Sequence, residues 1–253
     1  MNMIGSRLYI AVWSLLLSAV FAAAGAPVVE PVFLDSLSHD QNHFTQGLFF
    51  DGKELVESTG QYGRSSLYRY DASGKILDSA ELQERYFGEG SVVVGEDLFY
   101  LTWKSKKAFI YNRRPFAPKG EFRIPTEGWG LSFWNNSLIM SNGSHELLLI
   151  ALGSFNTFGT IEVKDDGRPV QKLNELEVAG NTLYANIWFS DSIAVIDLPS
   201  GKVQRYIDCS KKIAELRKKF PRMDVLNGIA FDGKDFWITG KNWPWIYKVQ
   251  LPK

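Results

Sequence analysis

The chain has 253 residues, and its 28 Lys and Arg residues balance 28 Asp and Glu residues. A net charge of zero gives no indication of binding to nucleic acid or to an anionic membrane surface. The single cysteine, Cys209, excludes an intrachain disulfide and is expected to be an ordinary small buried residue, and the three histidines (His39, His43 and His145) lack the spacing of a metal site or a cysteine protease.

Residues 1–26 are predicted to be a secretory signal peptide. Arg7 precedes an apolar stretch from Leu8 to Phe21, and small residues follow it, so cleavage is expected after Ala24 or Ala26. The alternative is an uncleaved membrane anchor, because the apolar stretch can be extended to about 18 residues. Export without disulfides predicts a periplasmic or secreted protein, with residues 27–253 forming one domain that leaves the membrane once the signal is cleaved.

The rest of the chain repeats a pattern of short apolar runs. Five copies start 43, 40, 45 and 53 residues apart. They are "QGLFFDGKELVESTG" (46–60), "EGSVVVGEDLFYLTW" (89–103), "WGLSFWNNSLIMSNG" (129–143), "NELEVAGNTLYANIW" (174–188) and "NGIAFDGKDFWITGK" (227–241). Repeats of about 40–50 residues with several strands each are typical of propeller blades.

Each copy carries a turn former at the same place, and each of these residues can adopt the positive φ of a tight hairpin: Gly52, Gly95, Asn135, Gly180 and Gly233. A third run follows in every unit, and a fourth run follows in the first four units. The run at 28–37, "VVEPVFLDSL", can supply the missing strand of the last unit and so remove an open sheet edge. We therefore predict an all-β fold, a five-bladed β-propeller closed by an N-terminal strand that completes the last blade.

The last spacing is the longest because it contains "SKKIAELRKKFPRM" (210–223), a basic, helix-like insertion that ends near Pro221. Such a run is usually a solvated surface, and the alternative is that it steers acidic peptides.

Propeller geometry brings two positions of each repeat to the same end of the central channel. The residue just before the first strand and the residue just past the second strand are fourteen apart in every copy. The leading residues are Gln46, Glu89, Trp129, Asn174 and Asn227. The trailing residues are Gly60, Trp103, Gly143, Trp188 and Lys241.

This end of the channel is therefore predicted to hold a small-ligand site, because it combines aromatic walls with a few polar groups. The tryptophans can instead plug the channel. One carboxylate and one ammonium among indoles are costly unless they form an ion pair or take part in chemistry. Glu89 and Lys241 are thus candidate functional residues, and a plain ion pair is the alternative.

Several motifs in order resemble the plant and bacterial type of glutaminyl-peptide cyclotransferase, the glutamine cyclotransferase family. They are "HFTQGL", "GEG…LTWKS", "GWGL", "LNELE…NIWFSD…ID…G" and "VLNGIAF…TGKNWP", and they cover about residues 40–250. The resemblance implies a five-bladed propeller that converts N-terminal glutamine of peptides and proteins to pyroglutamate with release of ammonia. It also implies that the enzyme has no cofactor and needs no zinc, unlike the unrelated animal enzyme. We expect it to act as a monomer.

The resemblance also implies roles for individual residues. The family's catalytic glutamate falls on Glu89, and its substrate-binding glutamine falls on Gln46, next to Phe44. Its tryptophans fall on Trp103, Trp129 and Trp188, its asparagine on Asn174 and its lysine on Lys241. We expect Glu89 to act as general acid and base, and Asn174 and Lys241 to stabilise the negative charge on the carbonyl oxygen. The role of Asn227 stays open.

Two other classes of function remain open. A calcium-dependent propeller hydrolase would also use Glu89, Asn174 and Asn227, but such a site usually has more carboxylates, and Lys241 would repel the cation. A non-catalytic peptide-binding propeller would use the same tryptophans to bind peptide termini without turnover.

Overall fold

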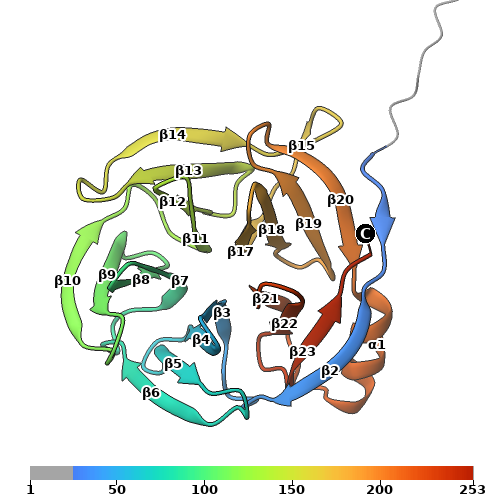
Figure 1. The fold of residues 1–253 in the computed structure, drawn as a ribbon, viewed down its shortest axis with the longest axis horizontal. Coiled ribbons are helices and arrows are strands. Elements are labelled where there is room, and N and C mark those ends of the chain that lie inside the picture. The colour runs from blue at the N-terminus through green and yellow to red at the C-terminus, as the bar shows by residue number, and fades with distance from the viewer. Residues whose placement is uncertain (1–24, 253) are drawn as a thin grey trace, which may run out of the picture.

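The computed structural model describes residues 25–252, which form β-sheets arranged in a ring around a central channel (Figure 1). Nearly all of the segment predicted to be a signal peptide lies outside the described residues. Within the described part of the chain, no helix is both long enough and apolar enough to cross a membrane.

Four of the sheets are regular antiparallel blades of four strands. The first contains β3 (Thr45–Asp51), β4 (Glu54–Thr59), β5 (Ser66–Tyr70) and β6 (Ile76–Glu81). The second contains β7 (Gly88–Val94), β8 (Asp97–Thr102), β9 (Lys107–Asn112) and β10 (Pro118–Arg123). The third contains β11 (Leu131–Trp134), β12 (Ser137–Met140), β13 (Glu146–Ala151) and β14 (Thr157–Glu162). The fourth contains β21 (Leu226–Phe231), β22 (Phe236–Gly240), β23 (Trp245–Gln250) and β2 (Val32–Ser38).

The remaining sheet differs from the prediction of five four-stranded blades, because it contains seven strands. Its central strands are β17 (Leu173–Ala179), β18 (Thr182–Ile187), β19 (Ser192–Asp197) and β20 (Lys202–Asp208). Its short additional strands are β1 (Val28–Val29), β15 (Lys164–Asp165) and β16 (Arg168–Pro169). Only four of the sheets are therefore regular four-stranded blades, and the prediction of five such blades is wrong. Strands of two residues leave no alternation of apolar and polar residues in the sequence, which is why the repeat pattern missed them.

The N-terminal run divides between two sheets. Val28 and Val29 pair in parallel with β20, whereas β2 pairs antiparallel with β23 from Val32↔Gln250 to Ser38↔Trp245. The break falls at Pro31, which has no N–H to donate to a strand partner. The predicted closure by an N-terminal strand is thus present at β2, and the same segment also extends the neighbouring sheet.

The hairpin turns agree with the sequence analysis. Gly52, Gly95, Asn135, Gly180 and Gly233 all have positive φ. Asn135 and Asn136, at φ 47° and 59°, join Trp134 to its partner Ser137 as a two-residue turn, so the "NNS" sequence forms a hairpin.

Apolar clusters between neighbouring sheets hold the ring together. Inner strands β3, β7, β11, β17 and β21 surround the channel, and the fourth strands lie on the outside (Figure 1).

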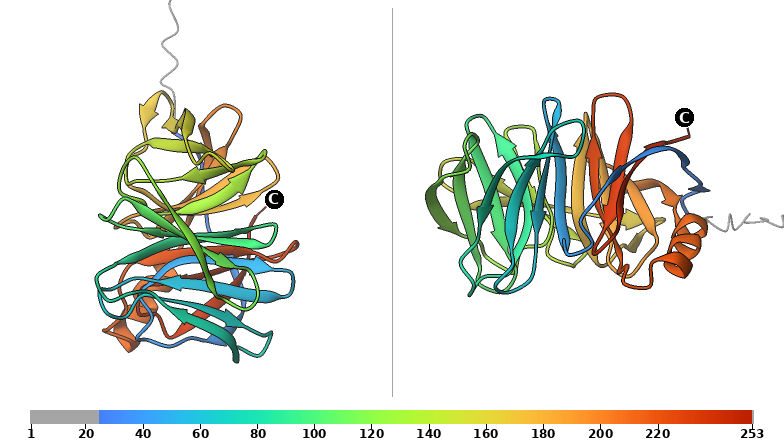
Figure 2. Two further views of the ribbon diagram at one scale, coloured as in Figure 1. Left: turned by 90° about the vertical axis from the view of Figure 1, so that its left-hand side faces the viewer. Right: turned by 90° about the horizontal axis from the view of Figure 1, so that it is seen from below.

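The basic insertion forms helix α1 (Ser210–Lys219) on the outer rim beside β2 (Figures 1 and 2). Its buried Ile213 and Leu216 pack in the cluster between the sheets of β17–β20 and β21–β23, where Cys209 is also buried. Burial raises the pKa of the Cys209 thiol to about 12, which fits the expected role of a small apolar residue.

Candidate active site

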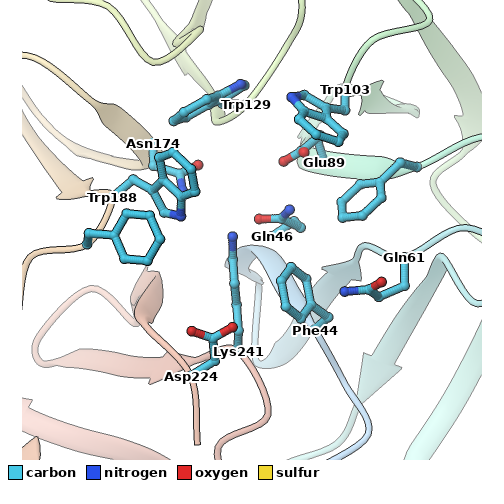
Figure 3. A pocket seen from close by; sticks show the side chains of 12 residues that line it. Phe44, Gln46, Gln61, Glu89, Trp103, Trp129, Asn174, Trp188, Asp224 and Lys241 are labelled. Atoms are coloured by element: carbon cyan, nitrogen blue, oxygen red, sulfur yellow. The ribbon is translucent and has the colours of Figure 1, made fainter.

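A cavity of about 270 Å³ opens at one end of the central channel (Figure 3). We call it the channel pocket. It is lined by Phe44, Gln46, Gln61, Phe87, Glu89, Trp103, Trp129, Asn174, Trp188, Phe189, Asp224 and Lys241. All eight residues predicted for the site are among them. Asn227, whose role was left open, does not line the cavity.

Local strand geometry directs Gln46, Glu89 and Asn174 into the channel pocket. In four sheets, the pairing of the first two strands shifts register where the first strand begins. The residues inside these irregular stretches include Gln46, Glu89, Asn174 and Asn227. A β-bulge bends its strand and changes the direction of a side chain. Repeated bulges therefore turn polar groups from separate sheets towards one place.

The trailing residues reach the same end because backbone hydrogen bonds fasten them beside the leading ones. The N–H of Trp103 donates to the carbonyl of Phe87 at 3.0 Å, and the N–H of Lys241 donates to the carbonyl of Val225 at 3.0 Å. Trp188 donates in the same way to Lys172 at 2.9 Å. This regular pairing explains why residues fourteen apart in the repeat meet in the pocket.

The glycines around Glu89 let neighbouring strands approach closely. A Cβ atom on Gly90 would lie 2.7 Å from the backbone N of Leu131 and 2.7 Å from the carbonyl O of Trp129. A Cβ on Gly88 would collide with the hydroxyl of Tyr100. The N–H of Gly90 also donates to the carbonyl of Trp129 at 2.7 Å. The glycines thus allow the tight strand contact that presents the Glu89 carboxylate to the pocket.

Glu89 and Lys241 are buried and remain unpaired with each other. Glu89 is only 4% exposed and Lys241 only 5% exposed, and neither forms an ion pair with another described residue. Burial raises the pKa of Glu89 well above its usual range, although the Lys241 ammonium opposes this and Glu127 adds to it. Burial lowers the pKa of Lys241, while Glu89 and Asp224 act in the opposite direction. The plain ion pair considered in the sequence analysis is therefore absent.

The other polar groups have defined orientations. Asn227 contacts Gln46: its Nδ2 donates to the carbonyl of Thr45 at 2.9 Å and to Oε1 of Gln46 at 3.3 Å. This contact leaves the amide N–H groups of Gln46 for the pocket. The Oδ1 atom of Asn174 is buried and has no hydrogen-bond partner among the described residues. Such an orphaned acceptor is costly unless a ligand satisfies it.

Aromatic rings form the walls of the channel pocket. Trp129 and Trp188 meet edge to face with centroids 5.3 Å apart, and Phe87 and Trp103 meet at 5.5 Å. Phe44 lies under the Lys241 ammonium, with Nζ 4.7 Å from its ring centroid. Trp103, Trp129 and Trp188 therefore line an open cavity at this end of the channel.

Four lining residues were missed by the sequence analysis: Gln61, Phe87, Phe189 and Asp224. Phe87 stands two residues before Glu89, just as Phe44 stands two before Gln46. Gln61 and Phe189 directly follow trailing positions of their repeats. If the comparison of repeats had included two residues before each leading position and one residue after each trailing position, it would have found Gln61, Phe87 and Phe189. Asp224 has no such signal in the repeats.

A second buried polar cluster, the Glu57 cluster, includes His43 and Thr45, the chain neighbours of the pocket residues Phe44 and Gln46. Glu57 is fully buried, and its carboxylate accepts hydrogen bonds from Thr45 Oγ1 at 2.7 Å and Tyr70 Oη at 2.8 Å. It also lies 3.0 Å from a ring nitrogen of both His39 and His43. These two histidines and Glu57 are close enough to hold a metal ion, which their spacing in the sequence did not indicate. Their ligand atoms already have hydrogen-bond partners within the cluster.

Comparison with known proteins agrees with the motifs. Residues 7–251 match the family described as glutamine cyclotransferase. The chain belongs to the glutamine cyclotransferase family. A glutaminyl-peptide cyclotransferase of Arabidopsis thaliana is 37% identical over 219 residues, covering 84% of this chain and 68% of the plant protein.

Solved structures show the same relationship. The crystal structure of Myxococcus xanthus glutaminyl cyclase is 32% identical with a TM-score of 0.81, covering 89% of this chain and 97% of that protein. A protein of unknown function from Bacteroides caccae has a TM-score of 0.51 at 12% identity, covering 66% and 68% of the two chains, and shares the fold alone.

Proposed function

We infer that the channel pocket is where this glutamine cyclotransferase converts the N-terminal glutamine of a peptide into pyroglutamate and releases ammonia. The α-amine of the substrate attacks its own side-chain carboxamide carbon. A carbon–nitrogen bond forms to close the five-membered ring, and the bond to the amide nitrogen then breaks. The substrate supplies its own nucleophile, so no serine or cysteine is needed.

Glu89 is the proposed proton shuttle. The attacking amine must lose a proton and the departing nitrogen must gain one, and a single carboxylate can carry it between them. Burial raises the pKa of Glu89 well above its usual range, which makes its carboxylate a stronger base than an exposed one. The observation that carries this proposal is that Glu89 and Lys241 are buried in one aromatic pocket without forming an ion pair.

The remaining groups are proposed to bind the substrate and stabilise the tetrahedral intermediate. Lys241 donates to the carbonyl oxygen as negative charge gathers on it, and so does the amide of Asn174. The orphaned Oδ1 of Asn174 can accept from a substrate N–H. Gln46 and the aromatic walls hold the side chain folded towards its own amine, and such orientation can supply several kcal/mol, up to about 7–11.

The test is to incubate the protein with glutaminyl dipeptides and to measure ammonia and pyroglutamyl product. Cyclisation far above the spontaneous rate is expected. Binding of these dipeptides without turnover would favour a non-catalytic peptide-binding protein, and no effect on any of them would refute the proposal.

Catalysis is further proposed to need no metal. Within residues 25–252, no histidine or cysteine lines the channel pocket, and the Lys241 ammonium shares the pocket with the carboxylates of Glu89 and Asp224. A divalent cation would therefore meet few ligands and a like charge. We predict that dialysis against a strong chelator leaves kcat and KM unchanged. Activity that is lost and then restored by zinc or calcium would contradict this.

The protein is also proposed to be exported as a monomer, with residues 1–26 as the signal peptide. The charged start, apolar stretch and small residues of this segment support export. N-terminal sequencing of the exported protein should begin at Gly25 or Pro27, and size-exclusion chromatography should give the mass of one chain. An intact N-terminus retained in the membrane would show that the segment is an anchor.

A further inference from the structure

Phe189 lies at the mouth of the channel pocket with an exposed apolar ring. It lines the cavity, and yet 67% of its surface is accessible to water. Burying a phenylalanine is favourable, so folding gains little from a ring in this position. A single exposed apolar side chain is common and by itself indicates nothing.

The backbone gives a second, independent indication. The N–H of Ser190 donates to the carbonyl of Ile187 at 2.9 Å, which makes residues 187–190 a β-turn. Phe189 is the third residue of this turn and has a φ of 65°. Glycine or asparagine normally occupies such a position, because a bulky side chain is strained there. Phe189 is therefore both strained and exposed, and strained residues of this kind cluster at ligand sites.

The position is also constrained by its neighbours. The ring of Phe189 packs on Trp188, with centroids 4.3 Å apart and planes inclined by 33°. The Lys172 ammonium lies 5.9 Å from its centroid, and Lys172 also has a positive φ, of 65°. One face of the ring thus rests on a wall of the pocket, and the exposed part extends that wall outwards.

The position of the substrate determines what can lie against this ring. If the glutamine side chain and its α-amine occupy the pocket beside Glu89, the peptide must leave through the mouth. The next residue begins about 3.8 Å from the α-carbon of the glutamine, so its side chain falls at the rim. Figure 3 shows Trp188 on one side of the pocket and Gln61 on the other, and Phe189 directly follows Trp188 in the chain.

We propose that Phe189, resting on Trp188, binds the side chain that follows the N-terminal glutamine and makes the enzyme prefer an apolar or aromatic residue there. The proposal rests on the proposed function, because it requires glutamine in the channel pocket. Contact between two aromatic rings is worth about 0.5–1.5 kcal/mol, which corresponds to about a 2- to 13-fold preference in kcat/KM.

The test compares Gln-Phe, Gln-Leu, Gln-Ala and Gln-Glu amides as substrates of the wild type and of Phe189→Ala. The wild type is expected to prefer Gln-Phe and Gln-Leu over Gln-Ala, mainly through a lower KM. Phe189→Ala should lose most of this preference, whereas Phe189→Tyr should keep it. Phe158→Ala is the matched control, because Phe158 is 63% exposed but lies on the outer strand β14, and it should leave every rate unchanged.

Several outcomes would overturn the proposal. Equal kcat/KM for all four substrates, a preference for Gln-Glu directed by Lys172, or a preference that persists in Phe189→Ala would each do so. If Phe189→Ala proves unstable, Phe189→Asn suits the positive φ and removes the ring, so the same comparison applies. Failure of the wild type to cyclise any of the four would refute the proposed function itself, whereas cyclisation without preference would refute only the binding role of Phe189.

Discussion

Glu89 shows how one buried side chain can be tested separately from the fold. Glu89→Gln keeps the size and shape of the side chain but removes the group that titrates. Since general acid–base catalysis is typically worth about 10²–10⁴-fold, we predict that kcat falls by that order while the melting temperature changes little. Both quantities are to be measured on one preparation.

Glu127→Gln is the matched control, because Glu127 also influences Glu89 electrostatically but does not line the channel pocket. It should retain most of the wild-type kcat. A Glu89→Gln protein that melts early but turns over normally would show that Glu89 has a structural role instead.

Lys241 gives a prediction of pH dependence with a defined sign. The Lys241 ammonium lowers the pKa of Glu89, against the larger effect of burial, which raises it. Glu89 must be ionised to take the proton from the amine, so kcat should fall as pH drops below its pKa. In Lys241→Met the pKa of Glu89 should rise further, and the acid limb of kcat should move to higher pH. Lys104→Met should leave the limb in place, because Lys104 sits 4.0 Å from the ring centroid of Trp103 and does not line the pocket. If the acid limb of kcat falls at the same pH in Lys241→Met as in the wild type, a group other than Glu89 controls that limb.

At the scale of strands and turns, the repeat pattern predicted most of the candidate site. The alternation of apolar and polar residues and the turn formers placed the inner hairpins, and the fixed spacing of fourteen paired Glu89 with Trp103 and Asn174 with Trp188. Neither Asp224 nor the Glu57 cluster could be predicted in this way. Their side chains meet through contacts between segments that no repeat relates, as when His39 reaches the carbonyl of Trp243 at 2.7 Å.

The Glu57 cluster positions two walls of the channel pocket at once. Glu57 holds Thr45, which is next to Gln46, and His39, whose Nδ1–H donates to the carbonyl of Trp243. The N–H of Asn242, next to Lys241, donates to the carbonyl of His43 at 2.8 Å. Burial disfavours the charged forms of Glu57 and His39. Even so, His39 and His43 hold the pKa of Glu57 well below its usual range, and Glu57 raises the pKa of His39 above the usual value for histidine.

We predict that Glu57→Gln lowers both stability and catalysis. Removing one partner of a buried ion pair typically costs about 3–5 kcal/mol, and the walls that carry Gln46 and Lys241 lose their common support. Unfolding in urea and kcat/KM at a temperature where the protein stays folded are to be measured together, with kcat and KM reported separately.

Asp51→Asn provides the control for Glu57→Gln. Asp51 is buried at the opposite end of β3, where it pairs with Arg69 at 2.6 Å. This substitution should destabilise the protein to a similar extent but leave kcat/KM of the folded enzyme near the wild-type value. Equal catalytic losses in both variants would mean that Glu57 acts through general stability alone.

At the scale of the whole molecule, contacts across and around the ring hold the strands in place. Glu175, on β17, reaches across the channel, and its carboxylate accepts from the N–H of Leu48 at 3.3 Å and of Ile229 at 2.9 Å. It therefore links the three inner strands β3, β17 and β21, and it directly follows Asn174 in the chain. Burial raises the pKa of Glu175 well above its usual range. The ring is completed by β2 on β23, which joins the two ends of the described chain.

Removal of β2 should therefore open the ring. A variant that begins at residue 39 exposes the full edge of β23, which we expect to cause loss of cooperative unfolding and self-association, since unpaired edges bind other strands. A variant that begins at residue 32 loses only the two-residue strand β1 and should stay folded and monomeric with a slightly lower melting temperature. Adding a peptide of residues 30–39 to the first variant should restore both its melting transition and its cyclase activity, because the peptide can pair with β23 in the native register. A monomeric variant beginning at residue 39 with wild-type stability would show that the apolar clusters between the sheets hold the ring without this strand.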